Sequence, residues 1–369
     1  MRGVVPTGAS SSGLDRPPIL REDGTADEAR DPDLPKATLL RTYRAMSLVR
    51  SLDERCMNLQ RQGRIGFYGT STGEEGAVLG SASAMRDTDW MFPALRQGGA
   101  LLYRGFPLRR YFDHLFGNAQ SVEMGRSMPC HYSDRAEHFV TWSSSMATQL
   151  PHAVGMAYAA KLKGRGDIAI GYMGDGSTSE GDFHVAMNFA GVWKTPVVFF
   201  CNNNQWAISV PFRKQTASHG IAIKARAYGF PGVRIDGNDV LGVFVATREA
   251  AQRARDGLGP TLIEAVTYRM QGHSSSDDPT RYRSAEEVEA WKRRDPLVRF
   301  RAYLTHRGLW SPADEEKLLV GLNDEITEAI RAAEATGQSP TDTLVSEVFA
   351  DVPWHLKAEY AEFQETLRR

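Results

Sequence analysis

Hydrophobic residues in the middle of the chain form short uninterrupted runs, and longer segments of mixed character separate these runs. The runs that predict buried strands are residues 167–173, 196–201, 233–235 and 261–266. Residues 179–192 and 240–255, which lie between them, have the length and pattern of helices. Strands that alternate with helices in this way indicate βαβ units and a parallel sheet, which binds ligands at the carboxyl ends of its strands. We therefore predict an α/β fold with a doubly wound, mainly parallel sheet flanked by helices.

The two ends of the chain have other patterns. Residues 1–36 are rich in Pro, Gly, Ser and Asp without periodicity, which predicts a flexible arm. Apolar residues recur at helical spacing between residues 39 and 49, and a second helix is predicted over residues 74–85. These patterns divide the chain into an N-terminal arm over residues 1–36, an α/β domain over residues 37–350 and a C-terminal helical tail over residues 351–369.

Composition and charge narrow the class of protein. The 44 Lys and Arg residues nearly balance the 45 Asp and Glu residues, and the net charge of −1 argues against a nucleic-acid-binding protein. Cys56, Cys130 and Cys201 are far apart, which excludes a disulfide framework and a CxxC zinc site. No apolar run reaches the roughly 18–20 residues of a membrane span, and the N-terminal residues lack the pattern of a secretory signal or transit peptide. We expect a cytoplasmic protein that binds neither nucleic acid nor membrane.

The sequence Gly-Asp-Gly-Ser-Thr-Ser-Glu-Gly at residues 174–181 carries the clearest candidate chemistry. It follows a predicted strand, and Ser177 and Glu180 have the spacing of a capping box, which predicts that the next helix begins there. Glycines allow a ligand to approach the backbone, and a helix N-terminus favours phosphate. Asp175, at the carboxyl end of a strand, is suited to bind a hard cation. Taken alone, this segment is equally compatible with a structural turn.

Two other phosphate-binding fingerprints do not match these residues. A dinucleotide-binding GxGxxG sequence would need glycine at position 179, where this chain has Ser179. A Walker A loop would need a following Gly-Lys-Ser/Thr, which is missing. A nicotinamide-dependent dehydrogenase is therefore disfavoured.

Three asparagines, residues 202–204, follow the next predicted strand. One strand–helix–strand step separates them from Asp175, so both segments emerge at the same edge of a parallel sheet. We therefore predict that Asp175 and Asn204 meet around one metal ion. The alternative is that the asparagines serve only as turn formers.

This arrangement resembles the thiamine-diphosphate-binding motif, in which a GDG sequence is followed one strand–helix–strand step later by NN. The resemblance implies that Mg²⁺ is held by Asp175, by Asn204 and by the backbone carbonyl of Trp206, and that the diphosphate hangs from the metal. One acid and one amide suit Mg²⁺, which binds to few protein carboxylates when phosphates complete its ligands.

Further motifs resemble the alpha subunits of the thiamine-diphosphate-dependent decarboxylase component of 2-oxo acid dehydrogenase complexes. They lie at residues 61–68, 73–76, 125–132, 181–184, 188–190, 200–209 and 268–283. Branched-chain members are the more similar ones, through residues 70–76, 138–141 and 273–278. The resemblance implies a thiamine-diphosphate-binding fold with helical extensions at both ends. It also implies decarboxylation of branched 2-oxo acids and reductive acylation of a lipoyl group, with pyruvate and acetoin dehydrogenase alpha subunits as the alternatives.

The resemblance gives His273 the catalytic role, in decarboxylation or in transfer to lipoamide. The positions that it implies for cofactor binding are Leu95, Arg96, Ser144, Met146, Gly174, Gly176, Ser177, Asn202 and His273. Arg96 matches an arginine that grips the diphosphate. Leu95 and Asn202 depart from the family pattern, which has Tyr at the first position and Arg or Gln at the second. These departures predict weaker cofactor binding and keep open a scaffold that has lost catalysis.

Residues 268–283 match the active-site loop of the family. The residues of this loop with implied roles are Arg269, Ser274, Asp277, Tyr282 and Arg283. Ser274 matches a serine that is phosphorylated in animal enzymes, and we expect no such regulation from this sequence alone. The charged residues predict ion pairs that hold the loop; they are Asp277, Asp278, Arg281 and Arg283.

The resemblance has two further implications. A potassium site of branched-chain relatives is matched by Ser143, Ser145, Thr148 and Gln149, although these residues also read as a Ser-rich start of a helix. The glutamate that engages the aminopyrimidine ring comes from the beta subunit in this family. The active site is therefore expected between subunits, in a heterotetramer of two alpha and two beta chains that docks on a lipoyl acyltransferase core.

Overall fold

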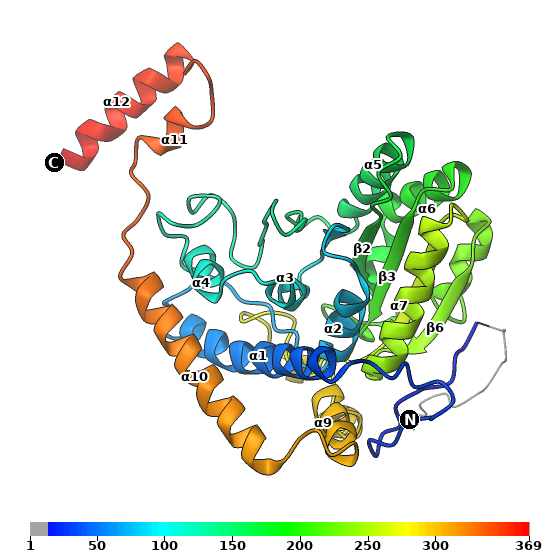
Figure 1. Ribbon diagram of the computed structural model, residues 1–369. Helices are drawn as coiled ribbons and strands as arrows, with labels where there is room; N and C mark the ends of the chain where they lie inside the picture. The colour runs from blue at the N-terminus through cyan, green and yellow to red at the C-terminus, as the bar shows by residue number, and fades with distance from the viewer. Residues whose placement is uncertain (1–13, 369) are drawn as a thin grey trace.

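A parallel sheet lies between helices on the right-hand side of the molecule as Figure 1 shows it. The computed structural model describes residues 14–368. In that range the largest sheet has the strand order β1-β2-β3-β7-β6, and every neighbouring pair is parallel. Its strands are β1 (Trp90–Phe92), β2 (Ala169–Gly174), β3 (Val197–Asn203), β6 (Gly232–Asp236) and β7 (Thr261–Val266). The predicted α/β fold with a mainly parallel sheet is confirmed.

Helices cover both faces of the sheet, because alternate residues of each buried strand point to opposite sides. In β3, Val198 and Phe200 belong to one core cluster, whereas Phe199 and Cys201 belong to another. The first cluster includes residues of α1 (Lys36–Arg61), α2 (Glu75–Ala84) and α7 (Val240–Arg255), and the second includes residues of α5 (Gln149–Leu162) and α6 (Gly181–Trp193). The site-bearing edge of the sheet is therefore fixed from two sides.

The remaining helices build the extensions. They are α3 (Gly98–Arg104), α4 (Leu108–Phe116), α8 (Ala285–Lys292), α9 (Pro296–His306), α10 (Pro312–Glu334), α11 (Thr343–Ser346) and α12 (Trp354–Arg368). α10 runs past α1 and α4, while α11 and α12 project away from the body (Figure 1). α12 occupies the predicted helical tail. Over residues 14–368, no helix is both long and apolar enough to cross a membrane.

The predicted flexible arm needs correction over residues 14–35; residues 1–13 of that prediction lie outside the described chain. Arg16 N donates to Arg234 O (2.9 Å), which attaches the segment to the edge strand β6. Ile19 N donates to Asp239 Oδ2 (2.6 Å) at the start of α7, and Leu20 is completely buried. The polar composition concealed this outcome, because two consecutive apolar residues suffice to anchor the segment in the core.

The anchoring of this segment predicts a clear effect of Leu20→Ala. Removing a completely buried leucine side chain should lower the free energy of unfolding by about 2–5 kcal/mol, through lost burial and the cavity left behind. Urea unfolding of the two proteins followed by circular dichroism measures the difference. A change below about 0.5 kcal/mol, as at a typical surface position, would mean that the segment is not part of the core.

The start of α6 also differs from the prediction. Ser177 does not cap the helix with its side chain; residues Asp175–Ser179 form a 3-10 helix, and α6 begins at Gly181. Glu180 N donates to the backbone carbonyl of Ser177 (3.2 Å), and Glu180, the residue before α6, makes no side-chain capping bond. Thr178 Oγ1 instead donates to the carbonyl of Asp175 (2.9 Å), which tightens the turn. A tight turn therefore separates Asp175 from the helix.

Candidate active site

The carboxyl ends of β2 and β3 lie side by side, as the sequence predicts. Gly174 and Asn202 are partners in the parallel register, so the chain leaves the sheet at Asp175 and at Asn204 along the same edge. Both residues are almost fully buried. The side chain of Glu74, the residue immediately before α2, lies close to both of them.

The Glu74 carboxylate accepts hydrogen bonds from two asparagine side chains and pairs with an arginine at this edge. Its Oε1 accepts from Asn204 Nδ2 (2.8 Å) and lies 3.3 Å from Arg96 Nε, and its Oε2 accepts from Asn202 Nδ2 (3.0 Å). Gly73 has a φ of 98°, and a Cβ there would lie 2.2 Å from the Tyr268 carbonyl oxygen, so glycine is required for the chain to turn Glu74 inward. Sequence reasoning missed Glu74, although two adjacent glutamates before the uncharged residues of α2 were a usable signal.

Burial dominates the electrostatics of these acids. Burial raises the pKa of Asp175 to about 7, and the carboxylate of Glu74 adds to this effect, while the Arg269 guanidinium opposes it. The pKa of Glu74 is also raised by burial, against the lowering effect of Arg96 and the two asparagine amides. Two carboxyl groups in one buried site favour a cation beside them.

Two oxygen atoms at this edge support that inference. Asp175 Oδ2 and Asn202 Oδ1 are buried and have no hydrogen-bond partner within residues 14–368. Among residues 14–368, Asn204 Oδ1 accepts from Trp206 N (3.1 Å). Carboxylate and amide oxygens are the ligands that Mg²⁺ prefers, so this donor set fits the metal. The amide of Asn202 donates to Glu74, which leaves its Oδ1 as the free polar atom at this edge, and its role in cofactor binding stays a prediction.

Arg96 connects this edge to His273. Its Nη2 donates to the His273 carbonyl (2.9 Å) and lies 3.3 Å from His273 Nδ1. Because a guanidinium can only donate, Nδ1 is the acceptor, and the proton of the neutral ring resides on Nε2. Burial lowers the pKa of His273 to about 3, and the positive charges of Arg96 and Arg269 contribute, against the opposing effect of Asp277. His273 is therefore a neutral hydrogen-bond donor at ordinary pH.

The loop around His273 is held by backbone carbonyls rather than by the predicted ion pairs. Arg269 Nη2 donates to the carbonyl of Ile208 (2.7 Å), and Arg283 Nη2 donates to that of Met270 (2.6 Å). Asp277 Oδ2 accepts from His273 N (2.6 Å) and from the Tyr282 hydroxyl. In residues 14–368 no ion pair joins Asp277 or Asp278 to Arg281 or Arg283, and Arg283 donates to the carbonyls of Met270 and Gln271 instead.

Trp206 and Gly176, a predicted metal position and a predicted cofactor position, are in contact with other residues of this chain. The carbonyl of Trp206 accepts a long hydrogen bond from Arg269 Nη1 (3.3 Å). A Cβ at Gly176 would lie 2.7 Å from the Cβ of Ala207, so the hairpin of β4 (Trp206–Ala207) and β5 (Val210–Pro211) itself requires glycine there. Ser177 is buried in the same turn, whereas a Cβ at Gly174 would meet nothing within 4 Å. The turn therefore presents its backbone beside Asp175.

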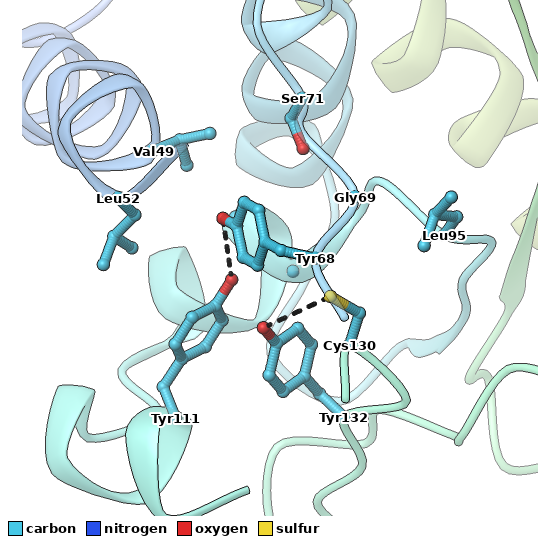
Figure 2. A pocket seen from close by; sticks show the side chains of 11 residues that line it. Val49, Leu52, Tyr68, Gly69, Ser71, Leu95, Tyr111, Cys130 and Tyr132 are labelled. Carbon is cyan, nitrogen blue, oxygen red and sulfur yellow. Dashed lines mark hydrogen bonds between the residues drawn. The ribbon is translucent and has the colours of Figure 1, made fainter. Parts of the chain in front are cut away.

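Other predicted cofactor positions lie apart from this cluster. Ser144 is exposed, and its hydroxyl lies 2.9 Å from His131 Nε2; the side chain of Met146 is 45% exposed. Leu95 lines a small pocket beside the backbone of Gly69. In Figure 2 the side chains of Tyr68, Tyr111, Tyr132 and Cys130 gather in this pocket. In the described part of the chain, no hydrogen bond joins Ser144 to Asp175 or His273.

The predicted potassium ligands form a turn before α5. Thr148 Oγ1 donates to the carbonyl of Ser145 (2.9 Å), and Ser145 N donates to Ser143 Oγ (3.2 Å). Gln149 Nε2 donates to the carbonyl of Tyr172 (2.7 Å), and Gln149 Oε1 is buried without a partner among residues 14–368. The turn thus offers several oxygen atoms in one short segment.

Comparison with known proteins identifies the family. The model of the dehydrogenase E1 component family matches residues 43–341, and the chain belongs to this family. It is similar to the alpha subunit of mitochondrial 2-oxoisovalerate dehydrogenase from Homo sapiens, with 42% identity over 95% of this chain and 78% of the relative. The corresponding subunit from Caenorhabditis elegans is 42% identical over 91% of this chain and 78% of that protein. The alpha 2 subunit from Arabidopsis thaliana is 43% identical over 89% and 70%, respectively.

Proposed function

We propose that this chain is the alpha subunit of a branched-chain 2-oxo acid dehydrogenase that decarboxylates 2-oxoisovalerate and related acids and acylates a lipoyl group. The observation that carries the proposal is the pair of unpartnered buried oxygens, Asp175 Oδ2 and Asn202 Oδ1, beside the buried guanidinium of Arg96. Such an edge accommodates a divalent cation together with an anion. The similarity to 2-oxoisovalerate dehydrogenase alpha subunits supports the substrate class.

In this proposal, Mg²⁺ binds to Asp175, Asn204 and the carbonyl of Trp206, and Arg96 contacts the diphosphate. Family membership implies dependence on thiamine diphosphate, which supplies the electron sink for decarboxylation. Glu74 holds the amide N–H groups of Asn202 and Asn204, so their oxygens remain available for the cation. His273 holds its proton at Nε2, where the neutral ring can serve as a hydrogen-bond donor.

The site requires a second subunit in this proposal. Ser144 and Met146 are exposed in this chain. A beta subunit would cover them and contribute the glutamate that engages the aminopyrimidine ring. We propose a heterotetramer of two alpha and two beta chains that docks on a lipoyl acyltransferase core. The three unpaired, buried cysteines agree with a reducing compartment, and the cytoplasmic location stays a prediction, since the relatives named above are mitochondrial.

Reconstitution tests this function. The chain, its beta subunit and the mixture are assayed with thiamine diphosphate, Mg²⁺ and an artificial electron acceptor, on 2-oxoisovalerate and on pyruvate. We expect activity only in the mixture, with kcat/KM at least about tenfold higher for the branched acid. Equal activity of the isolated chain would refute the intersubunit site. A preference for pyruvate would replace the substrate assignment with the pyruvate alternative.

The proposed potassium site gives a separate prediction. Replacing Na⁺ with K⁺ should raise the thermal midpoint of the assembled protein by about 2–4 °C, because an ion that binds only the folded state stabilises it. Thr148→Val, which removes one oxygen of the turn, should abolish this difference. Differential scanning calorimetry in the two salts measures it. Equal midpoints for wild type in both salts would favour the reading of these residues as an ordinary helix start.

A further inference from the structure

Asp53 is a buried acid that the proposed chemistry does not use. It lies on α1 and is 2% exposed. Its Oδ1 accepts from the Tyr68 hydroxyl (3.0 Å), and its Oδ2 accepts from Ser71 N (2.8 Å) and Thr72 Oγ1 (2.6 Å). All three donors belong to residues 68–72, which we name the Tyr68–Thr72 segment. The Asp53 carboxylate thus accepts three hydrogen bonds from one segment of irregular backbone.

The burial of Asp53 is unfavourable in itself. Within residues 14–368 no lysine, arginine or histidine forms an ion pair with it. Burial raises its pKa to about 7, and the nearby carboxylate of Glu75 adds to this, while the three hydrogen bonds oppose it. Burying a carboxyl group costs free energy that hydrogen bonds only partly offset. A small apolar residue would avoid this cost, so the purpose of Asp53 must lie in what the Tyr68–Thr72 segment contacts.

The Tyr68–Thr72 segment also contacts Arg96. The carbonyl of Thr70 accepts a hydrogen bond from Arg96 Nη1, and Ser71 Oγ donates to the carbonyl of Arg96 (2.9 Å). The segment therefore fixes both the backbone and the guanidinium of this arginine. Asp53 binds to the same segment through Ser71 N.

The same segment also contacts the loop on both sides of His273. The carbonyl of Thr72 accepts from Met270 N (3.1 Å), and the carbonyl of Tyr68 accepts from Ser275 N (2.9 Å). Tyr68 N in turn donates to Ser275 Oγ (3.2 Å). His273 therefore lies between two loop residues, Met270 and Ser275, that are both hydrogen-bonded to the Tyr68–Thr72 segment. Asp53 binds to the same segment.

We infer that Asp53 is a positioning residue: by fixing the Tyr68–Thr72 segment it sets both the diphosphate-binding Arg96 and the loop that carries His273. The inference rests on the proposed function for the roles of Arg96 and His273. It does not depend on that function for the contacts themselves. Loss of the carboxylate releases three hydrogen-bond donors and lets the segment, and with it both site elements, move.

The test compares two substitutions of Asp53. Asp53→Ala removes all three acceptor contacts, whereas Asp53→Asn keeps an oxygen for Ser71 N and Thr72 Oγ1 and can donate to the Tyr68 hydroxyl. In the complex with the beta subunit, calorimetry with thiamine diphosphate and Mg²⁺ should show a dissociation constant raised at least about tenfold in Asp53→Ala and within about threefold of wild type in Asp53→Asn. A wild-type dissociation constant in Asp53→Ala would overturn the inference.

Hydrogen exchange gives a readout that needs no cofactor. The backbone amides of Met270 and Ser275 should lose protection in Asp53→Ala and retain it in Asp53→Asn, because both amides bond to the Tyr68–Thr72 segment. If wild type itself fails to bind thiamine diphosphate, the proposed function fails, while the exchange result still decides the role of Asp53. Unchanged protection in Asp53→Ala would overturn the inference.

A matched control separates positioning from general stability. Asp113 on α4 is equally buried and accepts from Asn118 Nδ2 (2.7 Å) and Arg109 Nε (2.9 Å), neither of which belongs to the Tyr68–Thr72 segment. Asp113→Ala should lower the thermal midpoint yet leave cofactor affinity within about twofold and the two amides protected. If Asp113→Ala weakens the cofactor as Asp53→Ala does, the effect is only structural. Should Asp53→Ala not fold, Thr72→Val removes one donor, and unchanged affinity and exchange in that variant would overturn the inference.

Discussion

Asp175→Ala is expected to abolish the Mg²⁺-dependent binding of thiamine diphosphate, with a dissociation constant at least about 100-fold higher than that of wild type. The reason lies in the unpartnered Oδ2, the anionic oxygen at this edge that is not already bound to protein donors. Without it, the cation would depend on amide and carbonyl oxygens alone, which are weak ligands in the absence of a carboxylate. Isothermal titration calorimetry of the complex with the beta subunit measures the effect.

Stability measurements distinguish a ligand from a structural acid in this case. A buried carboxyl oxygen without a donor destabilises the ligand-free fold, so Asp175→Ala should unfold at the same or a higher urea concentration than wild type. Glu180→Ala, which removes an exposed carboxylate from the same turn, should bind the cofactor like wild type. Strong cofactor binding by Asp175→Ala would refute the metal site, and equal weakening by Glu180→Ala would reduce it to a general charge effect.

The sheet and the meeting of two site-bearing strand ends at one of its edges could be predicted because both depend on local pattern. Continuous apolar runs such as residues 197–201 are required for strands that are buried on both faces, and parallel strands direct their carboxyl ends to one edge. The proximity of Asp175 and Asn204 follows from those two facts alone. Family resemblance added the identity of the cofactor, which spacing does not contain.

The role of Glu74 could not be predicted in the same way. Its partners Asn202 and Asn204 lie 128 and 130 residues away, so only the assembled fold brings their amides to its carboxylate. The loop charges were misjudged for a similar reason. Arg269 and Arg283 bind to carbonyls that point inward only after the loop has folded, and a charge pattern does not show this competition. In residues 14–35, two apolar side chains outweighed a polar composition.

Leu95 and Asn202, which suggested a weakened cofactor site, have structural consequences that the sequence did not show. A Cβ at Gly69 would lie 2.8 Å from Leu95 Cδ1, so the leucine packs tightly over the backbone of that glycine. Asn202 joins Asn204 in binding to Glu74. Both substitutions are thus accommodated by contacts within the chain, which favours a working site over a scaffold that has lost catalysis.

His273→Ala should lower kcat by about 10²–10³-fold, the usual contribution of a preorganised hydrogen-bond donor, with little change in cofactor affinity. His355→Ala, at an exposed histidine of α12, should leave kcat unchanged. Assays with an artificial acceptor and with the lipoyl domain separate decarboxylation from acyl transfer, and the step that His273 serves is the one that slows. An unchanged rate in both assays would remove His273 from the mechanism.

The low pKa of His273 also predicts a pH dependence of stability. The imidazole binds a proton below about pH 6.5 in the unfolded chain but only near pH 3 in the folded one, so the unfolded state binds more protons between these values. Stability must therefore fall as the pH is lowered through this window, by up to about 1.4 kcal/mol per pH unit from this group. His273→Gln removes that contribution, so urea unfolding should show wild type losing about 2 kcal/mol relative to the variant between pH 7.5 and pH 5. A constant difference would mean that burial and the two arginines do not lower the pKa of His273 in the folded protein.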